Sequence, residues 1–128
     1  MPDWSKLKEK TFPRHADRGK EKLEFSSHYV IVWEFRVRPQ KEKDFVEKYG
    51  PDGSWARFFR RGQGYIRTEL VRDVADPMRF LTLDYWQSQS VFKKFREQHR
   101  AEYERLDKEF EGLTEKETRL SSFWIGEA

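Results

Sequence analysis

The segment from Tyr29 to Arg38, with the sequence YVIVWEFRVR, constrains the fold more than any other part of the chain. Side chains alternate between the two faces of a β-strand, so every second residue shares a face. The odd positions are all apolar, whereas the even positions change from Val30 and Val32 to charged residues. We therefore predict a central strand that is buried on both faces at its start. Helices are expected to cover one face, and another element must cover the second.

The composition indicates a small single domain. The chain has 128 residues, no cysteine, and 26 Lys and Arg against 23 Asp and Glu, which leaves a net charge of +3. The lack of cysteine excludes disulfides, thiolate catalysis and a zinc site built from Cys. The nearly balanced charge disfavours nucleic acid as a partner. Because the sequence contains neither a leader-like apolar run nor about 18 consecutive apolar residues, we expect a cytoplasmic protein that does not contact a membrane.

Two regions differ in their periodicity. Residues 1–27 show no sustained period of 2 or 3.6, and Pro13 and Gly19 interrupt any helix, so we predict an N-terminal arm that is extended or flexible. The alternative is that Trp4 and Phe12 dock onto the domain or onto a partner subunit. Residues 28–128 are expected to form the folded domain.

The first half of this domain contains one strand and two short helices before the second strand. Pro39 suits the first turn of a short helix that carries an apolar stripe and ends at Gly50. Residues 51–64 predict a second short helix that extends the first. A strand at 65–72 is expected to carry Ile66, Thr68 and Leu70 on one face, with Tyr65 on the other.

The second half of the domain begins with a turn at Asp76-Pro77, which joins the strand at 65–72 to another at 79–86 as a hairpin. Ser88 is the predicted N-cap of one long helix that ends at Gly112. Residues 114–117 resemble a capping box that opens a short turn, and residues 120–125 are expected to form the last strand.

The order strand, helix, strand, strand, helix, strand predicts an α+β fold of the ferredoxin-like βαββαβ type. Its four-stranded antiparallel sheet carries helices on one face only. Leaving the other apolar face open would expose at least the few hundred Å² that monomers tolerate. A second copy of the chain is the simplest cover, so we predict a homodimer that forms through the sheet face.

Several segments resemble a known family. They are VWEFRVRP, GYIRTEL, FLTLDYW running into Trp86-Gln87-Ser88, and the helix that begins with Val91-Phe92. Over residues 29–126 they resemble the antibiotic biosynthesis monooxygenase domains of the dimeric α/β-barrel superfamily. This resemblance implies a homodimer whose two sheets close into a barrel. It also implies one of three functions: cofactor-free oxidation of polycyclic aromatic compounds, haem degradation, or a role without assigned activity.

The haem-degrading relatives use an Asn on the first strand and a Trp and a His on the long helix. The matching positions of this chain hold Trp33, Phe95 and Arg105, and the sequence contains no Asn. The resemblance therefore disfavours haem degradation, whereas haem binding stays open as an alternative.

The cofactor-free relatives need an apolar pocket and a group that accepts a proton from a phenol. Candidate pocket residues, between the sheet and the long helix, are Trp33, Phe35, Phe58, Tyr65, Trp86 and Phe95. Candidate proton acceptors are His99, Tyr65, Tyr85 and Asp84. We favour His99 as the catalytic residue because histidine changes charge nearest neutral pH.

Each of these residues also has a structural interpretation. His99 and the tryptophans are as readily explained as core residues, and Asp84 and Glu69 as rim charges paired with arginine. No metal is expected, because the three histidines share no ligand spacing, and the resemblance to cofactor-free relatives implies no cofactor.

Two functions therefore remain in competition. One is a cofactor-independent monooxygenase that acts on a hydrophobic aromatic substrate. The other is a non-enzymatic dimeric module that binds a small hydrophobic molecule or is structural. RNA binding is a weaker alternative, since the strand at 79–86 lacks the glycine of the RNA-recognition pattern and contains Asp84.

Overall fold

The computed structural model describes residues 25–126, with side chains described from residue 28 onward. Its elements in chain order are β1 (Phe25–Val37), α1 (Glu42–Tyr49), α2 (Ser54–Phe59), β2 (Tyr65–Arg72), β3 (Arg79–Trp86), α3 (Gln89–Gln98), α4 (Arg100–Phe110), the 3₁₀ turn η3 (Glu111–Leu113) and β4 (Thr114–Gly126). Residues 1–24 of the predicted arm, which include Trp4 and Phe12, lie outside the described residues. Residues 25–27 belong to β1, so the strand begins earlier than expected.

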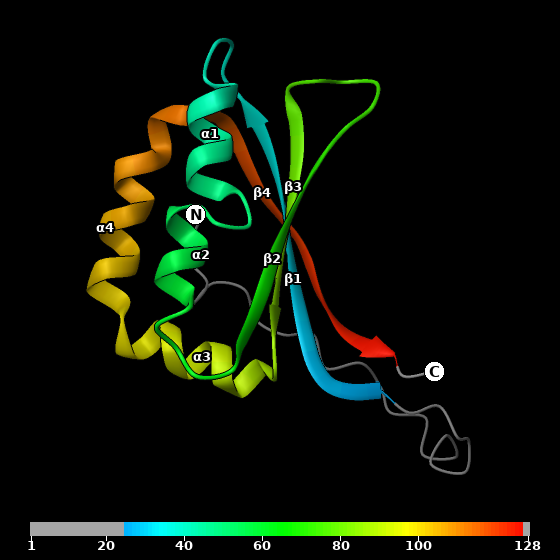
Figure 1. Ribbon diagram of the computed structural model, residues 1–128, viewed down its shortest axis with the longest axis vertical. Helices are drawn as coiled ribbons and strands as arrows, with labels where there is room; N and C mark the ends of the chain where they lie inside the picture. The colour runs from blue at the N-terminus through cyan, green and yellow to red at the C-terminus, as the bar shows by residue number, and fades with distance from the viewer. Residues whose placement is uncertain (1–24, 127–128) are drawn as a thin grey trace.

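The four strands form one antiparallel sheet in the order β2-β3-β1-β4. Helices α1 to α4, the α-helices of the described residues, lie against the same face of this sheet (Figure 1). The βαββαβ ferredoxin-like fold predicted from the sequence is thereby confirmed. None of the described helices is long and apolar enough to cross a membrane.

The core lies between the sheet and the helices and is built largely from aromatic rings. On β1 the odd positions face this core, and Trp33, Phe35 and Val37 are fully buried. Helices α1 and α2 contribute Phe45, Tyr49, Trp55, Phe58 and Phe59, and the later helices contribute Phe92, Phe95, Tyr103, Leu106 and Phe110. The alternation read in β1 is therefore correct.

The opposite face of the sheet is covered by no other element among the described residues (Figure 1). Strand β1 presents Val30 and Val32 there, beside Leu83 and Tyr85 of β3. Val30 and Val32 are 8% and 9% exposed. At the margins of this face, Val71 of β2 is 44% exposed and Phe123 of β4 is 51% exposed. We call this side of the sheet the uncovered face.

Several sequence predictions about elements are wrong. The single long helix is two helices, because His99, with φ −117° and ψ 29°, ends α3 and precedes α4. Pro39 precedes a turn in which Gln40 has φ 68°, and α1 begins only at Glu42. The proposed capping box does not open a turn, because Thr114 is already the first residue of β4, so the last strand covers Thr114–Gly126 and not only the predicted residues 120–125.

Candidate active site

Strand β3 places a carboxylate inside the core. Its positions alternate between buried and half-buried, so Phe80, Thr82, Asp84 and Trp86 share the face that meets the helices. Asp84 is only 4% exposed. An isolated carboxylate loses its hydration in such a place, which disfavours its charged form. The expectation that Asp84 is a rim charge paired with arginine is wrong, because strand alternation turns it inward.

Asp84 is held by a chain of two hydrogen bonds that begins on the neighbouring strand. Thr68 lies opposite Asp84 in the β2–β3 register, and its Oγ1 donates to Asp84 Oδ1 at 2.7 Å. The hydroxyl of Tyr65 lies 2.7 Å from the same Thr68 Oγ1. Since the Thr68 hydrogen is used toward Asp84, Tyr65 is the donor in the second bond. We call Tyr65, Thr68 and Asp84 the buried triad.

Tyr65 reaches this chain because β2 is irregular at its start. The register with β3 shifts between Tyr65 and Arg67, so one extra residue is inserted there. Tyr65 therefore shares a face with Thr68, whereas the sequence prediction placed them on opposite faces. Ile66, the residue between the register positions, is 37% exposed.

Burial raises the pKa values of two members of the buried triad. Burial raises the pKa of Asp84 to about 7, although the hydrogen bond from Thr68 acts in the opposite direction. Burial also raises the pKa of Tyr65 above its ordinary value. Asp84 can therefore exchange a proton near neutral pH, as a general base or acid must.

Two further polar atoms on the inward face of β3 have no hydrogen-bond partner among the described residues. They are Oγ1 of Thr82, which is 2% exposed, and Nε1 of Trp86, which is fully buried. Buried polar groups are hydrogen-bonded in the great majority of cases, so these two atoms stand out as potential donors to a bound molecule. Thr82 and Trp86 flank Asp84 on the strand, and the three together offer two donors and a proton acceptor.

The predicted pocket residues separate into two groups. Trp86 lies at the centre of the first group, with ring centroids 5.3 Å from both Tyr65 and Phe95. Phe58 joins this group through Phe95, at 5.0 Å. The two remaining residues, Trp33 and Phe35, lie 6.3 Å apart, and Phe35 packs against Phe45 and Tyr49 of α1.

His99 lies on the outer side of Phe95. Its ring centroid is 4.4 Å from that of Phe95, and it lines a groove of about 330 Å³. The residues that line this groove are Arg61, Gly62, Gln63, Val91, Lys94, Phe95, Gln98 and His99. We call it the α3 groove. The catalytic role predicted for His99 stays a prediction.

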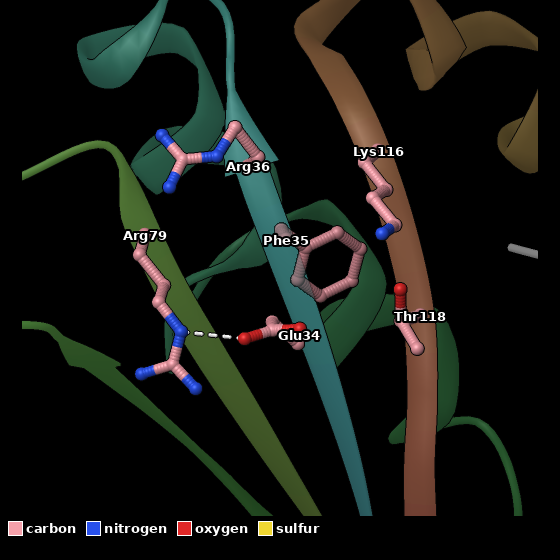
Figure 2. A pocket seen from close by; sticks show the side chains of 6 residues that line it. All are labelled: Glu34, Phe35, Arg36, Arg79, Lys116 and Thr118. Carbon is pink, nitrogen blue, oxygen red and sulfur yellow. Dashed lines mark hydrogen bonds and ion pairs between the residues drawn. The ribbon is translucent and has the colours of Figure 1, made fainter. Parts of the chain in front are cut away.

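A second hollow, of about 230 Å³, lies at the charged end of the uncovered face (Figure 2). Its lining residues are Glu34, Phe35, Arg36, Arg79, Lys116 and Thr118. Arg79 Nε lies 2.5 Å from Glu34 Oε2, and Arg36 pairs with Asp76. Two of its three cationic residues are thus already neutralised by carboxylates. Glu69 also lies on this face, 3.5 Å from Arg67, which confirms its interpretation as a paired rim charge.

No group of three or more His, Cys, Asp or Glu side chains able to hold a metal occurs within the described part of the chain. The site is therefore best described by its proton-transfer groups and its aromatic walls. The sequence prediction named Asp84 as a candidate proton acceptor but favoured a position at the rim, and it gave Thr68 no functional role. The available signal was the two-residue period of FLTLDYW, which puts Asp84 on the same face as Trp86.

Comparison with known proteins agrees with this fold. The sequence model of the family described as antibiotic biosynthesis monooxygenase matches residues 28–103. No curated protein matches the sequence. SnoaB, a cofactor-independent oxygenase from Streptomyces nogalater, is 15% identical with a TM-score of 0.58, over 79% of this chain and 95% of SnoaB. A provisionally assigned antibiotic biosynthesis monooxygenase from Deinococcus radiodurans is 12% identical with a TM-score of 0.63, over 78% and 94%.

Proposed function

Because this chain belongs to the antibiotic biosynthesis monooxygenase family, we propose that it is a cofactor-independent oxygenase of a hydrophobic aromatic compound, with Asp84 as its general base. The observation that carries the proposal is the buried carboxylate of Asp84, held by Thr68 inside an aromatic interior.

The chemistry required of the protein is limited. Asp84 takes the proton of an acidic hydroxyl or ring CH₂ group, and the resulting anion is electron-rich enough to reduce O₂ directly. With an anthrone as substrate, one oxygen atom enters the product as a carbonyl and the second leaves as water. The unpartnered Trp86 Nε1 and Thr82 Oγ1 can donate hydrogen bonds to the oxygen atoms of the substrate. The aromatic walls exclude water from the anion.

The first prediction concerns activity. We expect Asp84→Asn to lower the rate of oxygen consumption with hydroxylated anthrones by roughly 10²–10⁴-fold, because a general base contributes about that much. Initial rates in an oxygen electrode, with product identified by absorbance and mass, provide the measurement. Asp44→Asn makes the same chemical change on the exposed side of α1 and serves as the matched control. Equal rates for Asp84→Asn and wild type would exclude Asp84 as the base.

A non-enzymatic binding module is the second candidate, and one observation favours it. The rings of Phe59, Trp86 and Phe95 lie within 6 Å of one another and are at most 3% exposed, so they fill the interior. A ligand would have to displace one of these rings to reach Asp84. Thermal-shift screening with anthrones, quinones and haem separates the two functions. Stabilisation without oxygen consumption supports the module, because a ligand that binds the native state raises its melting temperature.

A further inference from the structure

The α3 groove is formed by two glycines that let a loop lie directly on α3. A Cβ atom at Gly62 would lie 2.3 Å from Cδ1 of Phe95. Gly64 has φ +89°, and a Cβ atom there would lie 2.4 Å from Cγ1 of Val91. Any other residue at either position would push the loop away from the helix. The floor of the groove therefore consists of the apolar side chains of Phe95 and Val91.

The walls of the groove carry positive charge and hydrogen-bond donors. Arg61, Lys94 and His99 come from the loop, from α3 and from its C-terminal end, and no carboxylate is among the lining residues. Arg61 is paired at the rim with Glu102, whose Oε2 lies 2.5 Å from its Nη1, so Lys94 carries the positive charge of the groove that no described carboxylate offsets. Its guanidinium carbon also lies 5.5 Å from the centre of the Phe58 ring. The amides of Gln63 and Gln98 add further donors.

We propose that the α3 groove binds a small organic anion, a carboxylate or phosphate monoester whose apolar part lies on Val91 and the exposed edge of Phe95. A concave surface with an apolar floor and a few converging polar groups has the form of a ligand site. Arg and Lys bind carboxylate and phosphate oxygens with charge-assisted hydrogen bonds. This site differs from the interior around Asp84, and its occupation requires no turnover.

Phe95 is the wall that the groove shares with the interior. On the groove side its ring contacts His99, and on the inner side it lies 5.3 Å from Trp86 and 5.9 Å from Phe59. An occupant of the groove is therefore one ring away from the aromatic cluster that flanks Asp84. This position suits either the acidic tail of an aromatic substrate or a separate small anion, and the inference holds for both.

The test uses the anions benzoate and phenyl phosphate as probes. Benzylamine and benzyl alcohol, of similar size, serve as the cationic and neutral control compounds. Two-dimensional NMR of the labelled full-length chain follows the backbone amides of residues 61–64 and 91–99 during titration. We expect saturable shifts there with the two anions only, weakened by added salt. Isothermal titration calorimetry supplies the dissociation constants.

The matched variants are Lys94→Ala and Arg61→Ala, with Lys43→Ala on α1 as a control of equal charge change outside the groove. We expect each groove variant to weaken benzoate binding at least about tenfold and Lys43→Ala to leave it unchanged. Thermal melting verifies that each variant is folded. Equal binding by wild type and Lys94→Ala, shifts centred on the uncovered face, or no saturable shift would overturn the proposal. None of these outcomes bears on whether Asp84 supports oxygen consumption.

Discussion

The titration of Asp84 lowers the free energy of unfolding as pH rises, whereas most carboxylates in folded proteins have the opposite effect. Its pKa is about 7 in the folded chain because burial disfavours the charge, whereas in the unfolded chain it returns to its ordinary value near 3.8. Between these two values the folded state binds more protons than the unfolded state, so this group lowers the free energy of unfolding as pH rises. Above pH 7 the full cost is about 4 kcal/mol, from roughly three pKa units.

The second prediction isolates this effect with Asp84→Asn, which keeps an acceptor for Thr68 but cannot ionise. At pH 5 the variant should be more stable by only about 1–2 kcal/mol, because Asp84 is still neutral in the folded chain but already ionised in the unfolded chain. At pH 8 the variant should be more stable by a few kcal/mol. Urea unfolding at both pH values measures the difference. A gap that does not widen from pH 5 to pH 8 would show that Asp84 titrates normally.

The third prediction concerns Thr68. Its hydrogen bond lowers the pKa of Asp84 against the larger effect of burial, so Thr68→Val should raise that pKa further. Thr82→Val is the matched control, since the Thr82 hydroxyl has no partner among the described residues and its loss should not destabilise the fold. Carbon-13 NMR titration of the Asp84 carboxyl measures the shift. An unchanged pKa of Asp84 in Thr68→Val would show that Thr68 does not hydrogen-bond to Asp84.

At the scale of elements, local patterns determined most of the structure. The two-residue period placed β2 and β3 with the predicted bounds, and the Ser88 N-cap is confirmed by its side-chain bond to Val91 N. The break at His99 has no local signal, because neither Gly nor Pro occurs there. The irregularity at Tyr65 is equally invisible in the residue pattern. The irregularity at Tyr65 belongs to the pairing of β2 with β3, and the inward position of Tyr65 follows from it.

The fourth prediction tests the close contact between the loop and α3. Gly62→Ala should destabilise the fold by about 1–3 kcal/mol, because its Cβ would overlap the Phe95 ring and force the loop or the ring to move. Gly112→Ala, with nothing within 4 Å of its Cβ, is the control and should be neutral or slightly stabilising. Denaturant midpoints of the two variants give the comparison. Equal midpoints would mean that the loop does not lie on Phe95.

At the scale of the whole molecule, helices on one side leave the apolar middle of the uncovered face without a cover among the described residues. Val71 and Phe123 are about half exposed at its margins, and Val32 and Leu83 lie between them. A second copy placed sheet to sheet would bury this area. The homodimer expected from the sequence is therefore our proposal for the solution state.

The fifth prediction uses Leu83→Asp, which places a charge in the middle of the uncovered face. Wild type should scatter light as a dimer at micromolar concentration, and the variant should dissociate or aggregate because a buried unpaired charge is costly. Val46→Asp, at a 44% exposed apolar position on α1, is the control and should leave the mass unchanged. A monomeric wild type would contradict the proposal.

The inward direction of Asp84 has a consequence for such a pair. Each carboxylate faces the helices of its own chain, on the side of the sheet away from the contact between copies. The two candidate sites would therefore act independently, each with the proton acceptor and the aromatic walls of its own chain. A hybrid of one intact and one Asp84→Asn protomer should accordingly turn over at half the normal rate.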